Sequence, residues 1–332
     1  MRLSVVIPVY NTESYLENCL QSVIAEHIPD MEIVLVDDGS TDSSSQLCDD
    51  YAHKYKEVIC LHISNSGPAT AKNVGLEKVS GEYVSFIDSD DCLLPEMYST
   101  LLDSAYKYHA DIVCCSYKQI DEEGVWSHTE YTGDLCVYDK EQAVKHLLDK
   151  NRIYSQCWTK IYKKKVLDDN HIRFVDGLKT EEDFLFNIQS FVESNIVVLN
   201  DKPFYVYTHR KGSLSREYHK EQLMQFCQNM AFRLDYTEKL VLKRLPMLTE
   251  SCVRHCVAYY NLMLGRIALS SSYHDYEHYF NIGHRYIRNH FRLLFNHHTS
   301  CGFSMLGAIL LCLLPSKLYY IYRNNKTKPL SF

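Results

Sequence analysis

Short apolar runs alternate with amphipathic, helix-like segments through residues 1–120, and this alternation constrains the fold more than any other feature of the sequence. We expect the first helix over residues 13–25, with Asn11 or Thr12 as its cap. Strictly alternating elements predict an α/β fold in which a parallel or mixed sheet carries helices on both faces. The five expected strands are RLSVVIPVY, MEIVLVDD, VICLHIS, EYVSFID and ADIVCCSY.

Polar residues follow each of the first four expected strands. In sheets of this kind ligands bind at the carboxyl ends of the strands, which is where these residues would lie. One acidic strand end could be a helix cap, but four polar ends at one edge predict a binding site. The four ends are Pro8-Val9-Tyr10-Asn11, Asp37-Asp38-Gly39-Ser40, Ser64-Asn65-Ser66-Gly67 and Asp88-Ser89-Asp90-Asp91.

Three acids crowd the end of the fourth expected strand. Asp88 and Asp90 are two residues apart, so their side chains point the same way in an extended chain. Neighbouring carboxylates repel each other, and a divalent cation between them removes that cost; hard oxygen ligands favour Mg²⁺ or Mn²⁺. Alternatively, one carboxylate holds the metal and the other bonds a sugar hydroxyl. We expect Asp91 to cap the helix that Pro95 opens.

The pattern is less regular after residue 120. We expect helices over residues 140–148 and over the segment TEEDFLFNIQSFVES, with Phe184, Ile188 and Phe191 buried in the second. Two strands, IVVLN and PFYVYTHR, should follow. From Tyr218 to Phe295 the spacing of apolar residues predicts mainly helix.

The charge of the chain is unevenly distributed. The net charge is −7, but residues 251–332 hold nine Lys and Arg against two acids, a net of +7 that leaves −14 for the rest. A basic region of this kind suits an anionic partner. No helix-turn-helix, zinc-finger or aromatic RNA-binding signature accompanies it, so we expect an anionic membrane surface and no nucleic acid.

An apolar run of 12 residues, Phe303–Leu314, lies within the basic region and is shorter than the ~20 residues that a membrane-spanning helix needs. Aromatic and basic residues follow it, so we expect a membrane anchor over residues 301–323 that lies in the interface. The alternative is a core helix packed on the main domain.

The start of the chain and its cysteines indicate the compartment. Met1-Arg2 leads directly into the first strand pattern, and none of the thirteen cysteines forms a C-x-x-C pair. We therefore expect reduced, mostly buried thiols, no zinc site, and a cytoplasmic protein held peripherally at the inner face of the cell membrane.

Several motifs occur together in a known order. VVIPVYNTESYLENCLQSV, EIVLVDDGSTDSS, SGPATAKNVGL and GEYVSFIDSDD resemble, in order and spacing, the motifs of family 2 inverting glycosyltransferases with the A-type fold. The later segment EEDFLFN resembles the family's Glu-Asp-x-x-Phe motif, which carries the catalytic base. The resemblance implies a Rossmann-like nucleotide-diphospho-sugar transferase fold, with a helical C-terminal extension.

This resemblance assigns roles in binding the donor. Pro8 and Tyr10 would border the uracil, and Asp38 would accept a hydrogen bond from the base. Further expected contacts are Asn65 and Lys72 near the nucleotide, Asp88 at the ribose, Asp90 and His209 on a Mn²⁺ or Mg²⁺ ion, and Arg210 and Ser213 on phosphate. Lys72 departs from the family, which usually has Arg there, because it lacks the planar fork of guanidinium.

The catalytic base implied by the resemblance is Asp183, with Glu182 beside it and Trp158 as a wall of the sugar pocket. The residues alone favour plainer explanations. Acids are common in the first turn of a helix, Trp158 could simply pack in the core, and Lys72 could be a solvated helix lysine.

The expected function follows from these roles. An inverting glycosyltransferase would move a sugar from a UDP-sugar to a hydroxyl of a glycan, such as a polyprenyl-diphosphate-linked oligosaccharide of surface polysaccharide synthesis. Residues 1–120 would bind the nucleotide-sugar, residues 121–217 would bind the acceptor and supply the base, and residues 218–332 would form the basic helical region. The alternative is a membrane-associated scaffold that binds a nucleotide-sugar without catalysis.

Overall fold

The computed structural model describes residues 2–121, 126–128, 131–178, 180–209, 222–270 and 273–295. The chain separates into two compact units, residues 1–214 and 215–332, each with its own fold.

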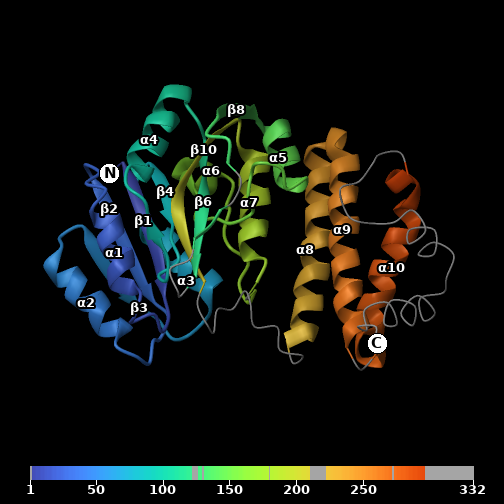
Figure 1. Ribbon diagram of the computed structural model, residues 1–332, viewed down its shortest axis with the longest axis horizontal. Coiled ribbons are helices and arrows are strands. Elements are labelled where there is room, and N and C mark those ends of the chain that lie inside the picture. Colours follow the sequence, from blue (N-terminus) through green and yellow to red (C-terminus); the bar gives the residue numbers. More distant parts are fainter. Residues whose placement is uncertain are drawn as a thin grey trace. The chain divides into compact units, whose positions relative to one another are not determined.

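A ten-stranded mixed sheet forms the centre of the first unit (Figure 1). The strand order is β3-β2-β1-β4-β9-β6-β10-β5, with β7 beside β6 and β8 beside β10. The first four strands in this order are parallel, which agrees with the predicted sheet. The strands are β1 (Leu3–Val9), β2 (Met31–Asp37), β3 (Val58–His62), β4 (Tyr83–Phe86), β5 (Cys92–Leu93), β6 (Ile112–Asp121), β7 (Trp126–His128), β8 (Leu135–Asp139), β9 (Lys160–Lys163) and β10 (Ile196–His209).

Helices cover both faces of this sheet. Successive side chains of β1 point to opposite faces, and apolar residues of both sets pack against helices. Leu3, Val5 and Ile7 join a core that includes apolar residues of α1, α2 and α4. Val6 points to the opposite face, where an ideal Cβ on Gly75 of α3 would lie 2.3 Å from it. The helices are α1 (Leu16–Ile24), α2 (Ser44–Lys54), α3 (Pro68–Lys78), α4 (Met97–Tyr108), α5 (Lys140–Leu148), α6 (Lys164–Asp169) and α7 (Glu182–Glu193).

Local details at two helix starts differ from the sequence expectations. The Asn11 side chain accepts from the Thr41 amide at 2.8 Å, and the Thr12 hydroxyl donates to Ser89 at 3.0 Å, so their expected capping of the first helix is wrong. Helix α4 begins at Met97, after Glu96 with a φ of 72°. Asn11 and Thr12 each hydrogen-bond to a loop that is distant in sequence, and local sequence patterns do not reveal such partners.

A single long strand, β10, replaces the two strands expected at IVVLN and PFYVYTHR. Its register on β6 shifts between Asn200 and Pro203, and again before Tyr205. Pro203 has no amide proton to donate, which suits a break in the ladder. The part before the shift pairs with β8, and Tyr205 after it pairs with β5.

The described residues of the second unit, 222–270 and 273–295, are mainly helical, as their sequence predicts. They form α8 (Leu223–Arg244), a short 3-10 turn η2 (Pro246–Leu248), α9 (Thr249–Leu269) and α10 (Tyr273–Phe295). Arg233 is fully buried in this unit, with a terminal nitrogen 2.7 Å from His255 Nε2 and its guanidinium 3.9 Å above the Tyr259 ring.

The expected anchor, residues 301–323, lies outside the described residues. Within the described part of the chain, we find no helix that is both long and apolar enough to cross a membrane.

Candidate active site

Hydrogen bonds join the chain segments that follow β1, β2 and β4. The Asp38 amide donates to the Val9 carbonyl at 2.8 Å, which ties the end of β2 to the end of β1. The Thr12 hydroxyl donates to the Ser89 hydroxyl at 3.0 Å, which ties the segment after β1 to the segment after β4. These polar ends therefore lie at one edge of the sheet.

The Asp38 carboxylate adds the end of β3 to this group. Its two oxygens accept from the Ser66 amide at 2.7 Å and the Gly67 amide at 2.9 Å, just before α3 begins. Asp38 is only 4% exposed. Each carboxylate oxygen has a second lone pair, so these bonds leave acceptor capacity for a ligand. Uracil recognition by Asp38 stays a prediction.

The neighbouring Asp37 braces the same loop from the other side. Its carboxylate accepts from the Ser40 amide at 3.0 Å and contacts His62 Nδ1 at 3.0 Å. Burial raises the pKa of Asp37, but the hydrogen bonds from Ser40 and His62 outweigh this effect and lower it. Asp37 therefore remains charged and fixes the loop between β2 and α2.

The other expected nucleotide contacts lie at the same edge. Tyr10 is 45% exposed and Asn65 is exposed, so both side chains can meet a ligand. Pro8 is half-buried within β1, opposite Val36. Gly39 has a φ of 71°, and a Cβ there would lie 2.9 Å from the Asn65 amide nitrogen, so only glycine lets these two loops approach so closely.

Lys72 is buried beside the expected catalytic residues. Its ammonium lies 2.8 Å from Asp183 Oδ1 and 3.4 Å from Glu182 Oε1, and 5.1 Å from the centre of the Phe174 ring. The Lys72 side chain is 3% exposed, so the alternative of a solvated helix lysine is wrong. This ion pair joins α3 to the first turn of α7 across 111 residues of sequence.

The ion pair controls the charge of all three groups. Burial alone would lower the pKa of the Lys72 ammonium, but the Asp183 and Glu182 carboxylates raise it well above its usual range. Burial raises the pKa of Asp183, yet Lys72 and the bonds from Cys157 lower it overall. For Glu182, burial prevails and the pKa is raised. Asp183 is therefore the carboxylate held ionised.

Cys157 is a partner of Asp183 that the sequence reasoning missed. Its amide donates to Asp183 Oδ2 and its thiol contacts Oδ1, both at 3.0 Å. The loop that carries Cys157 is held by buried Lys160, whose ammonium donates to two carbonyls of the loop. Asn187 donates to the Ser155 and Asp183 carbonyls, which fixes α7 against this loop.

Asp88 lies in the electrostatic field of this group. Burial raises the pKa of Asp88 to about 7; the Lys72 ammonium opposes the rise, whereas Asp183, Asp90 and Glu182 add to it. The acids after β4 and those at the start of α7 are thus near enough to repel one another. A cationic group at this place would relieve the repulsion.

Asp91 has a different role from the expected helix cap. Its carboxylate accepts from the Tyr205 hydroxyl at 2.6 Å and from the Thr208 amide at 2.7 Å. Burial, with Asp90 and Asp88 nearby, raises its pKa well above the usual range. The expectation of a helix cap is wrong because β10 supplies two donors that are remote in sequence.

His209 and Trp158 lie on or beside the same strand. His209 ends β10 and its Nε2 hydrogen-bonds to Gln119. Trp158 is 4% exposed and stacks on Tyr205, with ring centres 4.2 Å apart. This burial favours a packing role for Trp158, while its contact with a sugar and the metal role of His209 stay predictions. Arg210 and Ser213 lie outside the described residues.

The donor set fits a hard divalent cation. Asp88 and Asp90 are partly accessible oxygen donors, and Asp88 stands among repelling carboxylates, as a cation site requires. Asp91 is engaged by β10, so it is not counted among the ligands. Water and the oxygens of a bound ligand would fill the remaining positions of Mg²⁺ or Mn²⁺.

Comparison with known proteins decides the family. The profile described as "Glycosyl transferase family 2" matches residues 4–173, which is more than half of the 332-residue chain. The chain belongs to glycosyl transferase family 2. The matched range includes Asp38, Lys72, Asp88 and Asp90, whereas Asp183 lies beyond its end.

Two curated relatives are similar to this family 2 chain. Glycosyltransferase GlyA of Streptococcus pneumoniae serotype 4 is 32% identical over 240 residues, which cover 70% of this chain and 34% of GlyA. Poly(ribitol-phosphate) beta-N-acetylglucosaminyltransferase TarS of Staphylococcus aureus (strain Mu50) is 35% identical over 219 residues, or 64% of this chain and 36% of TarS. The chain thus matches about a third of the length of either relative.

The fold is shared with a solved structure. The crystal structure of S. aureus TarS 1–349 in complex with UDP-GlcNAc superposes with a TM-score of 0.74 at 23% identity. The superposition covers 98% of this chain and 89% of that chain. This likeness confirms the A-type glycosyltransferase fold.

We predict that Lys72→Met lowers the free energy of unfolding by about 3 kcal/mol, because it leaves buried carboxylates without their cation. Urea unfolding followed by circular dichroism measures the change. Lys78→Met, at an exposed position on the same helix, is the control and should cost less than about 0.5 kcal/mol. Equal effects of the two substitutions would show that the buried ion pair has no special importance.

Proposed function

We propose that this chain transfers a hexose or N-acetylhexosamine from a UDP-sugar to a hydroxyl of a glycan, with inversion at the anomeric carbon. The observation that supports this most is the buried group in which the Lys72 ammonium lies 2.8 Å from Asp183, close enough to Asp88 to shift its pKa. The proposed base and Asp88, one of the acids expected to bind the donor, thus lie close together in a family 2 fold.

The donor would bind across the four strand ends. Tyr10 and Pro8 would border the uracil, with Asp38 accepting from its N–H and Asn65 nearby. Asp88 would contact the ribose, and Asp90 with His209 would hold Mn²⁺ or Mg²⁺. Arg210 and Ser213 would contact phosphate. The exposure of Tyr10 and Asn65 and the loop contact at Gly39 support this arrangement.

Asp183 would act as the base. The acceptor oxygen attacks the anomeric carbon from the face opposite UDP, so a C–O bond forms as the bond to the diphosphate oxygen breaks. The hydroxyl proton passes to Asp183, and the bonding electrons leave with UDP. A divalent cation at Asp90 would offset the charge that grows on the departing diphosphate. Lys72 and Cys157 hold the Asp183 carboxylate ionised and oriented for this transfer.

The acceptor is proposed from the relatives and from the sequence of the tail. TarS is named for action on poly(ribitol-phosphate). The basic and apolar residues after residue 295 suit a membrane surface, where a polyprenyl-diphosphate-linked glycan would be found. We accordingly place the protein at the inner face of the membrane. A scaffold that binds a nucleotide-sugar without transfer is the alternative.

We predict that UDP-sugars are hydrolysed slowly in a reaction that requires Mn²⁺ or Mg²⁺, whereas GDP-sugars are not. The reason is that Asp38 is proposed to accept a hydrogen bond from the N–H of uracil. A screen of both donor classes, with nucleoside-diphosphate release as the readout and EDTA as the control, tests this. A strict preference for GDP-sugars would disprove the role of Asp38.

Asp183→Asn should abolish transfer, by about 10²-fold or more, because the amide cannot accept the proton. UDP-sugar affinity should stay within about threefold, measured by calorimetry on protein with a wild-type circular-dichroism spectrum. Glu193→Gln, at the other end of α7, is the matched control and should keep transfer activity. Full transfer activity in Asp183→Asn would show that Asp183 is not the base. Loss of both transfer activity and UDP-sugar binding in this variant would instead favour a positioning role.

Truncation after Phe295 should abolish binding to vesicles that contain anionic phospholipid, because it removes the apolar run and four of the basic residues. Co-sedimentation with anionic vesicles, compared with vesicles of phosphatidylcholine alone, measures this. Unchanged sedimentation of the truncated chain would show that the tail is not the anchor.

A further inference from the structure

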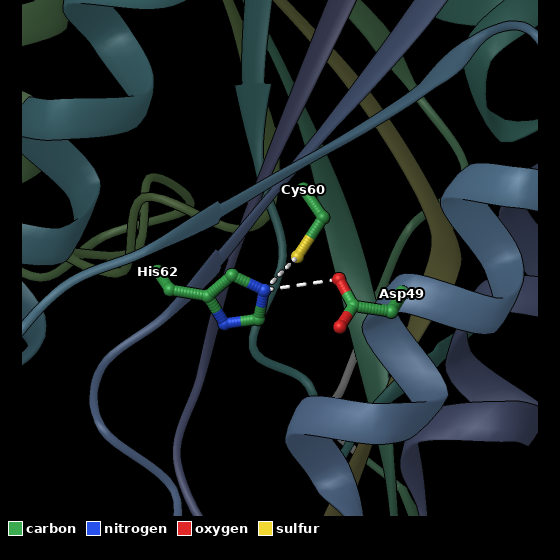
Figure 2. Close-up of side chains that lie close together, drawn as sticks. All are labelled: Asp49, Cys60 and His62. Atoms are coloured by element: carbon green, nitrogen blue, oxygen red, sulfur yellow. Dashed lines mark hydrogen bonds and ion pairs between the residues drawn. The ribbon is translucent and has the colours of Figure 1, made fainter.

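Three metal-ligating side chains converge at the edge of the sheet formed by β3 (Figure 2). Asp49 projects from α2, while Cys60 and His62 project from the same face of β3 because they are two residues apart. His62 Nε2 lies 3.0 Å from Asp49 Oδ1 and 3.4 Å from Cys60 Sγ. All three donor atoms lie within 4.8 Å of one another.

The two separations from His62 Nε2 are close to those around a tetrahedral zinc ion. Bonds of about 2.0 Å to nitrogen and oxygen and about 2.3 Å to sulfur put neighbouring ligand atoms roughly 3.3 to 3.6 Å apart. The two observed distances from His62 Nε2 need changes of only a few tenths of an ångström. Side-chain rotation in the half-buried Asp49 and Cys60 can supply them.

A second observation concerns the other ring nitrogen of His62. Nδ1 lies 3.0 Å from Oδ2 of Asp37, whose side chain is 4% exposed. A proton on Nδ1 that is donated to a carboxylate leaves Nε2 as the ligand atom. Carboxylate–histidine–metal arrangements orient histidine ligands in this way. The ring of His62 is therefore held with Nε2 directed at Asp49 and Cys60.

We propose that Asp49, Cys60 and His62 bind one Zn²⁺ ion, with water as the fourth ligand. On binding, the Cys60 thiol gives up its proton and Nε2 of His62 supplies its lone pair, while Asp37 keeps the proton on Nδ1. Thiolate and imidazole favour zinc over Mg²⁺ and Mn²⁺, so this site differs in chemistry from the cation site proposed at Asp90.

The ion would fasten α2 to β3, which is the edge strand of the sheet. The site is also connected to a neighbouring loop through Asp37. The Asp37 carboxylate contacts His62 and accepts a hydrogen bond from the Ser40 amide, in the loop that follows β2. Zinc would therefore stabilise both the sheet edge and this loop. The inference is independent of the transfer reaction, because it depends on ligand geometry alone.

Co²⁺ titration of the metal-free, untagged full chain tests the site directly. Wild type should bind one equivalent and develop a thiolate-to-cobalt charge-transfer band with the visible bands of tetrahedral cobalt, and Zn²⁺ should displace both. Cys60→Ser should lose the charge-transfer band, and Asp49→Asn and His62→Gln should weaken Zn²⁺ affinity by at least roughly tenfold.

Each substitution has a matched control. Asp50→Asn and His53→Gln change exposed residues of the same helix, and Cys136→Ser changes a half-buried thiol in β8. These three variants should bind zinc as wild type does. A second readout is thermal unfolding: Zn²⁺, but not Mg²⁺, should raise the midpoint of wild type and leave that of Cys60→Ser unchanged.

Two results would overturn the proposal. One is a wild-type chain that shows no thiolate–cobalt band and no stoichiometric zinc at micromolar concentrations. The other is equal zinc affinity in wild type, Cys60→Ser and His62→Gln, since that would place the ion on other residues. Neither result bears on UDP-sugar transfer, which the donor screen tests separately.

Discussion

The arrangement of the buried acids depends on the positive charge of the Lys72 ammonium. It is 3% exposed and lies between Asp183 and Glu182, with Asp88 near enough to feel its charge. Burial of several carboxylates without a cation would cost several kcal/mol for each ion. With the cation in place, α3 and α7 are held together, and a single carboxylate, Asp183, keeps a lowered pKa.

In the rest of the candidate site, backbone amides supply many of the hydrogen bonds to the acids. The amides of Ser66 and Gly67 satisfy Asp38, and the amide of Ser40 satisfies Asp37. On the other side, β10 supplies Tyr205 and Thr208 to Asp91. Asp37, Asp38 and Asp91 thus have donors from different segments, so the adjacent acids Asp37 and Asp38 acquire distinct roles.

Features with a local physical cause could be predicted from the sequence. The helix at residues 140–148 was placed correctly, because Asp139 and Gln142 form a capping box that marks its start. The polar ends of β1 to β4 are predictable because an apolar run indicates a buried strand, and the end of that run indicates where the strand reaches the edge of the sheet. Phe184, Ile188 and Phe191 are buried as the helical spacing required.

Features that depend on tertiary contacts could not be predicted. Lys72 and Asp183 are 111 residues apart, and nothing near Lys72 marks it as buried. The role of Asp91 depends on Tyr205 in a strand whose register shift was not apparent from its residues. Zinc was expected to be absent because no cysteine pair occurs; the grouping of Cys60 and His62 with Asp49, on which the zinc proposal rests, forms only in three dimensions, from one strand and one helix.

The hydrogen bonds of Asp38 have a consequence for how a ligand would bind. They hold the loop after β3 against the end of β2 before any ligand arrives, and Gly39 keeps the two loops in contact. A ligand that enters between them therefore loses little conformational entropy in ordering the chain around itself. Affinity at this edge would reflect mainly the contacts that the ligand makes, and association would require little rearrangement of the backbone.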